Sequence, residues 1–118
     1  MAVMKRKARP RTGVAMIVAA YPRRAVARRA ARELVRLGLL ACATVAPGAT
    51  TFYRWEGKFH HEPAVLLYGK TAASRASRAV KVIAALHPDR VPEILVLKTA
   101  GALPAYAAWV VAETKGKR

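Results

Sequence analysis

One short stretch of the sequence decides the fold: Tyr53-Arg54-Trp55-Glu56-Gly57-Lys58. Phe52 and Arg54 alternate with Tyr53 and Trp55, and this period of two is typical of a β-strand. Glu56-Gly57 then reverses the chain, with the glycine supplying the positive φ angle that a hairpin turn needs. Glutamate is a poor first residue in the commonest two-residue turn, so the sequence favours a two-residue turn and a glycine-bulge turn equally. In either form the stretch predicts the tip of a β-hairpin.

The strands of this hairpin extend far on both sides of the turn. Residues 40–45 and 50–55 predict one long strand with a bulge or bend at Pro47-Gly48, because proline cannot donate to a strand ladder. Residues 58–71 predict the returning strand, in which Pro63 marks an edge or another bulge. The apolar run 14–20 and residues 94–98 predict two further strands.

Two segments between the strands have helical spacing. The first, residues 23–37, begins after Pro22 and ends at Gly38, as helices commonly do. Its predicted core face consists of Val26, Ala30, Leu34 and Leu37. The second, residues 73–86, ends at His87-Pro88, because the residue before a proline is pushed out of the helical region. Its predicted inward residues are Ala76, Val80, Ile83 and Ala84. A short last helix holds Tyr106, Trp109 and Val110.

The predicted order is β-α-β-β-α-β followed by a helix. This order matches the ferredoxin-like α+β sandwich, in which two helices cover one face of an antiparallel sheet. We expect one domain over residues 14–114, a flexible basic tail over 1–13 and a basic tail over 115–118. The uncovered sheet face and the spare strand edges favour oligomerisation through the sheet.

Four blocks of sequence, in order, resemble the CutA family of divalent-cation tolerance proteins. They are the hairpin stretch 53–58, Gly-Leu-Leu-Ala-Cys-Ala at 38–43, Leu-His-Pro-Asp-Arg-Val-Pro-Glu-Ile at 86–94, and Tyr-Ala-Ala-Trp-Val at 106–110. The resemblance spans about residues 15–114. It implies a homotrimer with a metal-responsive or ligand-sensing role, and copper or a similar divalent ion as the ligand. Because the PII signalling proteins share this architecture, a PII-like small-molecule sensor is an alternative.

The resemblance also implies the residues of an intersubunit cleft: Tyr53, Trp55, Glu56, Lys70 and Glu93. The same side chains would serve equally well as hydrogen-bonding groups that hold subunits together. Candidate metal ligands are His87, Cys42 and His60. Each has a structural alternative: His87 can cap a helix end, Cys42 can be a buried small hydrophobe, and His60 can belong to a surface histidine pair. His60 shares a strand face with Glu62, but a closed metal site needs about four ligands.

The charge of the chain is the unusual feature of its composition. Twenty-two Lys and Arg residues oppose six Asp and Glu residues, giving a net charge of +16. Such a balance predicts binding to nucleic acid or another polyanion. The predicted polyanion-binding residues form a stripe at four-residue intervals: Arg24, Arg28, Arg32 and Arg36. A compositional bias, or a CutA scaffold deliberately resurfaced with cations, would also explain the charge.

Several classes of protein are excluded by what the sequence lacks. Cys42 is the only cysteine, so no intramolecular disulfide can form. No stretch approaches the ~20 apolar residues of a membrane-spanning helix, and the start of the chain does not have the pattern of a secretory signal. We therefore expect a cytoplasmic protein without membrane insertion. Neither a nucleophile-base pattern nor a glycine-rich phosphate loop is present, so we expect no enzymatic activity.

Overall fold

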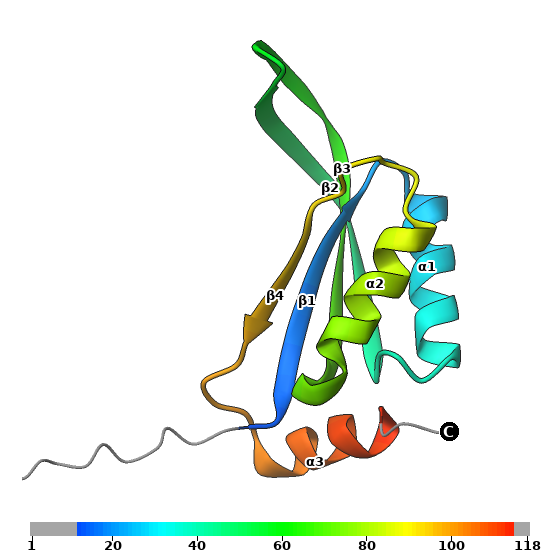
Figure 1. Ribbon diagram of the computed structural model, residues 1–118, viewed down its shortest axis with the longest axis vertical. Coiled ribbons are helices and arrows are strands. Elements are labelled where there is room, and N and C mark those ends of the chain that lie inside the picture. The colour runs from blue at the N-terminus through cyan, green and yellow to red at the C-terminus, as the bar shows by residue number, and fades with distance from the viewer. Residues whose placement is uncertain (1–11, 115–118) are drawn as a thin grey trace, which may run out of the picture.

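The computed structural model describes residues 12–114, so residues 1–11 of the first predicted tail and all of the second, 115–118, lie outside this range. In chain order the elements are β1 (Val14–Tyr21), α1 (Arg24–Arg36), β2 (Cys42–Trp55), β3 (Lys58–Ala72), the short 3-10 helix η1 (Ala73–Arg75), α2 (Ala76–Leu86), β4 (Ile94–Lys98) and α3 (Pro104–Glu113). The strands form one antiparallel sheet in the order β2-β3-β1-β4. Helices α1 and α2 cover one face of this sheet, and α3 lies across one end (Figure 1). The predicted ferredoxin-like α+β sandwich with an extra C-terminal helix is confirmed.

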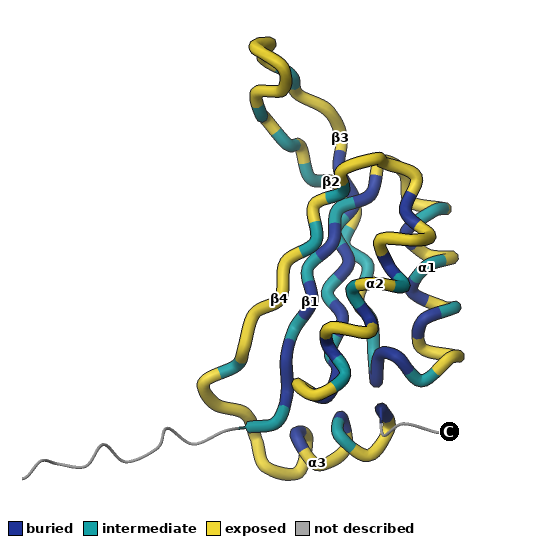
Figure 2. The backbone as a smooth tube through the Cα atoms, viewed as in Figure 1, coloured by how far each residue is buried: buried dark blue, intermediate teal, exposed yellow. Residues whose placement is uncertain are grey.

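The main core lies between the sheet and the two covering helices (Figure 2). Ile17, Leu67 and Leu34 are fully buried there. The predicted helix faces were partly wrong. Helix α1 buries Ala27, Ala31 and Leu34, whereas Leu37 is the C-cap and is exposed. Helix α2 buries Ala76, Ala79 and Ile83, and Ala84 is exposed. The alanines are small, so each helix packs closely against the sheet where they face it. The larger Val26 and Val80 lie at the sides of these contacts and are half-buried.

Strands β2 and β3 continue past the helical layer as a protruding hairpin (Figure 1). Trp55 pairs with Lys58, and both Glu56 (φ 51) and Gly57 (φ 78) have positive φ, so the turn is the two-residue form. The predicted bend at Pro47-Gly48 is confirmed by a register shift between residues 46 and 49. Strand β1 ends opposite Val65. Beyond that point the described part of β3 pairs only with β2, and its other edge has no neighbouring strand. Pro63 lies in this part of β3, so of the two predicted alternatives, an edge or a bulge, the structure has the edge.

The sheet face opposite the two helices is only half-buried in this chain. Along β1, Ile17 and Ala19 face the helices, while Met16 and Val18 alternate onto the other face. The outer strand β4 leaves Leu95, Val96 and Leu97 between 43% and 54% exposed. An exposed apolar strand at the edge of a sheet is a ready template for pairing with another chain.

Candidate functional site

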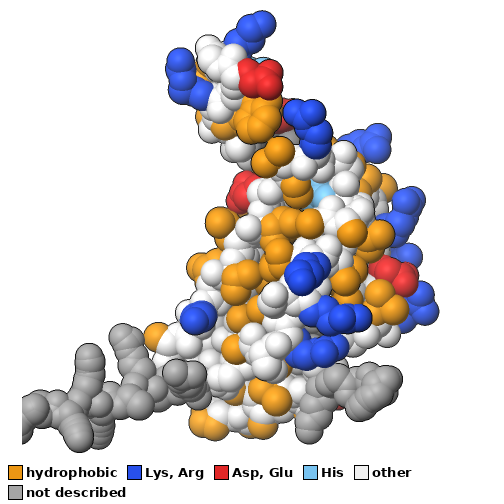
Figure 3. Space-filling view, viewed as in Figure 1, with side chains coloured by type: hydrophobic (Ala, Val, Ile, Leu, Met, Phe, Trp, Pro, Cys, Tyr) orange, Lys and Arg blue, Asp and Glu red, His pale blue; other side chains and the backbone are white. Residues whose placement is uncertain are grey.

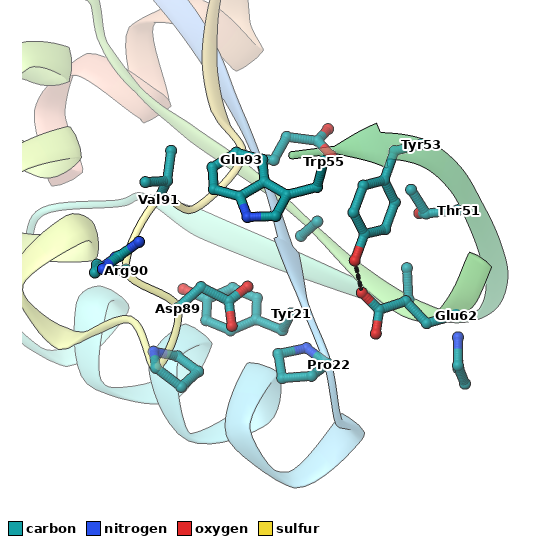
Figure 4. Close-up of a pocket in the computed structure, with 14 residues that line it drawn as sticks. Tyr21, Pro22, Thr51, Tyr53, Trp55, Glu62, Asp89, Arg90, Val91 and Glu93 are labelled. Carbon is teal, nitrogen blue, oxygen red and sulfur yellow. Dashed lines mark hydrogen bonds between the residues drawn. The ribbon is translucent and has the colours of Figure 1, made fainter. Parts of the chain in front are cut away.

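A pocket of about 580 Å³ lies where the hairpin leaves the main sheet (Figure 4). Three segments far apart in the sequence line it. The hairpin contributes Thr51, Tyr53, Trp55, Glu62, Pro63 and Ala64; the end of β1 and the following turn contribute Ala20, Tyr21 and Pro22; and the loop between α2 and β4 contributes Pro88, Asp89, Arg90, Val91 and Glu93. The pocket therefore exists only because the bent hairpin and this loop meet at the end of β1.

Tyr53 is held in place by contacts across the hairpin. Its ring stacks on His60, the residue opposite it on β3, with ring centroids 5.1 Å apart. Its hydroxyl donates a hydrogen bond to the Glu62 carboxylate, and this bond raises the pKa of Tyr53 above its ordinary value. Tyr53, His60 and Glu62 thus share one face of the hairpin, as the alternation of strand side chains predicts for His60 and Glu62.

His87 anchors the loop side of the pocket. It is the C-cap of α2, and its side chain is completely buried. Its Nε2 lies 2.6 Å from the Ala20 carbonyl oxygen, and its Nδ1 lies 3.0 Å from the Asp89 amide nitrogen. A carbonyl only accepts and an amide only donates, so Nε2 carries the proton and Nδ1 is the acceptor. The ring also stacks on Tyr21, with centroids 4.5 Å apart.

These contacts bear on both predicted roles of His87. The side chain joins the loop to β1 and does not cap the carbonyls of its own helix. Both ring nitrogens already have partners, so a metal ion would have to displace one of these two hydrogen bonds. The role of His87 as a metal ligand stays a prediction.

The pocket concentrates negative charge in a strongly positive protein. Its lining includes Glu62, Asp89 and Glu93, which are three of the six acidic residues in the chain, against one cation, Arg90. Figure 4 places the ring of Trp55 between Tyr53 of the hairpin and the loop that carries Asp89, Arg90 and Glu93. Carboxylates attract cations by charge, and aromatic faces attract them through the ring quadrupole. The chemistry of the pocket therefore favours a cationic ligand.

The described chain does not by itself complete a metal site. Within residues 12–114, no three His, Cys, Asp or Glu side chains lie close enough together to hold an ion. The candidate ligands His87, Cys42 and His60 accordingly do not form one cluster. A cation in the pocket would need ligands beyond those that a single copy of this chain brings together.

Two predicted cleft residues lie outside the pocket. Glu56 is at the exposed tip of the hairpin. Lys70 is near the other end of β3, where its Nζ donates to the Tyr68 carbonyl at 3.1 Å and to Thr44 Oγ1 at 3.3 Å. Of the five predicted cleft residues, Tyr53, Trp55 and Glu93 line this pocket within a single chain.

Cys42 lies directly opposite Lys70, at the start of β2. It is half-buried, so it is not the buried small hydrophobe that the sequence offered as an alternative. The reason is that its side chain lies on the sheet face opposite α1 and α2. Its Sγ lies 3.4 Å from the hydroxyl of Tyr106 on α3. This hydrogen bond is the main cause that raises the pKa of Tyr106 to about 12.

The sequence did not identify Tyr21, Thr51, Asp89 or Arg90 as pocket residues. Asp89 and Arg90 belong to the family-like block 86–94, and their place in that block was the sequence feature that could have identified them as pocket residues. Their distance from the hairpin depends on the bend in β2, which local periodicity does not report.

The sheet order, the two covering helices and the protruding hairpin define a ferredoxin-like α+β protein with a ligand-sized pocket at the hairpin base. A family model described as "CutA1 divalent ion tolerance protein" matches residues 15–113, and the chain belongs to this family. The divalent-cation tolerance protein CutA of Escherichia coli is 33% identical over 104 residues, which cover 88% of this chain and 93% of that protein.

Solved structures agree with this assignment. CutA from Xylella fastidiosa has a TM-score of 0.84 and 35% identity, over 87% of this chain and 99% of that chain. The divalent cation tolerance protein from Thermus thermophilus has a TM-score of 0.82 and 34% identity, over 86% of this chain and 98% of that chain.

Proposed function

We propose that this chain is a cation-responsive binding protein that acts as a homotrimer, and that a divalent cation such as copper binds at the hairpin pocket. The observation that supports this best is the placement of three carboxylates, Glu62, Asp89 and Glu93, in one pocket of a chain with a net charge of +16. His60 stacks on pocket residue Tyr53, and imidazole is a nitrogen ligand that suits copper. The proposed role is binding, not catalysis.

The trimer is part of this proposal because one chain leaves the site incomplete. The half-buried sheet face and the exposed apolar side chains of β4 supply a surface for two further copies. Packing along this edge would continue the sheet into a neighbouring subunit and add residues to the cleft. A PII-like small-molecule sensor shares the architecture, but no contact in the pocket points to a nucleotide.

The assembly can be tested by sedimentation equilibrium. We expect a mass three times the 12.8 kDa of the chain. Leu95→Asp should reduce this mass, because it places a charge on the exposed edge of β4. Leu37→Asp is the matched control, since Leu37 has the same 54% exposure but follows α1 in the helical layer. A monomer for the wild type would contradict the trimer.

The binding site can be tested by calorimetry with copper. The double substitution Glu62→Gln/Glu93→Gln keeps the shape of the pocket and removes two charges. We expect it to weaken copper binding at least about tenfold, roughly 1.4 kcal/mol. The control is Glu113→Gln, on the exposed end of α3 outside the pocket. Equal affinity of the double variant and the wild type would remove the pocket from the proposal.

The described residues contain no helix long and apolar enough to cross a bilayer. The cytoplasmic location expected from the sequence stays a prediction.

A further inference from the structure

We propose that the outer face of α1 binds the phosphate backbone of nucleic acid, independently of the cation pocket. The arginine face, as we call it, consists of Arg24, Arg28, Arg29 and Arg32. These four side chains, with Ala25, line one hollow on the surface of the helix. Arg24, Arg28 and Arg32 also line a second hollow against β2, so these three side chains stand between two depressions.

The spacing of the arginine face suits a polyanion with regular charges. Residues four apart on a helix lie on one face and about 6 Å apart along its axis. Arg24, Arg28 and Arg32 therefore present guanidinium groups over about 12 Å. Successive phosphates on one strand of a duplex rise about 3.4 Å along the axis and also turn around it, which sets neighbours roughly 7 Å apart in space, so the three groups match successive phosphates. Arginine is also the side chain whose donor geometry best fits phosphate oxygens.

Nothing in the described chain neutralises this face. Glu33 is the only acidic residue on α1, and its carboxylate accepts two hydrogen bonds from Arg36, at 2.8 and 3.0 Å. Arg36 was part of the predicted stripe, and its pairing with Glu33 places it outside the arginine face. Between residues 12 and 114, Glu33–Arg36 is the only ion pair that involves an arginine or lysine.

The neighbouring helix strengthens the positive field. Arg78 and Lys81 are exposed on α2, in the same layer as α1. Figure 3 shows Lys and Arg side chains gathered over this layer, with one acidic group among them. The helical layer lies opposite the half-buried sheet face, so an assembly formed through that sheet face would leave the arginines accessible.

The partner favoured by these observations is nucleic acid and not an anionic membrane. A helix that binds a bilayer needs an apolar side to insert. The apolar side of α1 consists of Ala27, Ala31 and Leu34, and all three are buried against the sheet. No aromatic residue occurs on α1, so base stacking and sequence preference are not expected.

The test compares two triple variants that change the net charge equally. Arg24→Gln/Arg28→Gln/Arg32→Gln removes three charges from the arginine face. Arg54→Gln/Lys58→Gln/Lys98→Gln removes three exposed charges from the hairpin and β4. Binding of a fluorescent 20-base-pair duplex is followed by anisotropy between 50 and 200 mM salt, and circular dichroism checks that each variant is folded.

We expect the wild type to bind the duplex at 50 mM salt without sequence preference and to lose affinity steeply as salt rises. The arginine-face variant should bind at least about tenfold more weakly, and the slope of log K against log salt should become shallower by about 2.7, or 0.9 for each lost contact. Glu33→Gln should tighten binding, because it removes a negative charge and frees Arg36. The charge-matched control should lose less than about threefold.

Three results would overturn the proposal. The first is no duplex binding by the wild type at low salt. The second is an equal loss in both triple variants, which would mean that net charge alone attracts the duplex. The third is binding to vesicles containing phosphatidylserine that is as tight as binding to the duplex and equally lost in the arginine-face variant. Variants of the cation pocket lie away from the arginine face and should change duplex binding by less than about threefold, as the charge-matched control does, so the two proposals can fail separately.

Discussion

Replacing His87 by alanine tests the contact that holds the pocket together. The imidazole bridges the Ala20 carbonyl and the Asp89 amide, and its ring stacks on Tyr21. Each lost hydrogen bond costs about 1 kcal/mol, and the lost stacking about 1 kcal/mol more. Because the side chain is completely buried, water cannot replace it without rearrangement. We therefore expect His87→Ala to lower the free energy of unfolding by about 3 kcal/mol.

Urea unfolding followed by tryptophan fluorescence measures this loss. In a thermal scan the same loss corresponds to about 12 to 24 °C, at about 4 to 8 °C per kcal/mol for a domain of this size. Protein concentration must be held constant, because association of subunits also contributes to the apparent stability. The matched control is His61→Ala, an exposed hairpin histidine stacked on Phe52, which should change stability by less than about 0.5 kcal/mol.

A loss below about 1 kcal/mol for His87→Ala would refute the structural role argued from these contacts. Copper titration of the same variant separates the two predicted functions of the residue. Copper affinity equal to that of the wild type would remove His87 from the metal ligands, whereas weaker binding by a folded variant would place it among them.

Three further predictions concern packing, the hairpin turn and pH. Gly69→Ala should lower the free energy of unfolding in urea by about 1 to 2 kcal/mol, because the new Cβ would meet the methyl groups of the buried Leu40 at 2.8 and 2.9 Å. Gly101→Ala is the control, because its new Cβ meets nothing within 4 Å and should leave stability nearly unchanged. Equal effects of the two substitutions would contradict the prediction. Glu56→Asn should stabilise the turn by about 0.5 kcal/mol, because asparagine tolerates positive φ, and amide exchange at the hairpin tip should slow about twofold. The pKa of Tyr106 is about 12 in the folded chain, above its ordinary value of 10.0. The folded state thus holds this proton more tightly, so the contribution of Tyr106 to stability is complete below pH 10 and is lost as pH rises to 12. Between pH 10 and pH 12 the free energy of unfolding should therefore fall less in Tyr106→Phe than in the wild type. An equal fall in both proteins would argue against the hydrogen bond.

The four strands and the helix positions could be predicted because each depends on neighbours in the chain. Strand β4 begins and ends at the predicted residues, 94 and 98. The bend at Pro47-Gly48 and the end of α2 before His87-Pro88 follow from the covalent limits of proline. The two-residue turn at Glu56-Gly57 was one of two forms left open, and the pairing of Trp55 with Lys58 decided between them.

The candidate site could be predicted only in part. Tyr53, Trp55 and Glu93 were identified through motif blocks and do line one pocket, whereas Lys70 came from the same resemblance and lies near the opposite end of β3. Motifs preserve residue types in order along the chain. They do not report how far the hairpin bends toward the loop, and that bend decides which side chains meet.

The sequence by itself determined the family, the order of the elements and the excess of positive charge, because these are properties of composition and local spacing. Only the tertiary structure decided that His87 uses both ring nitrogens, that Glu33 engages Arg36, and that three carboxylates share a pocket. The physical reason is that hydrogen bonds and ion pairs extend over only a few ångströms. Whether two side chains come within that range depends on the packing of helices against the sheet and on the bend of the hairpin, which involve the whole chain at once.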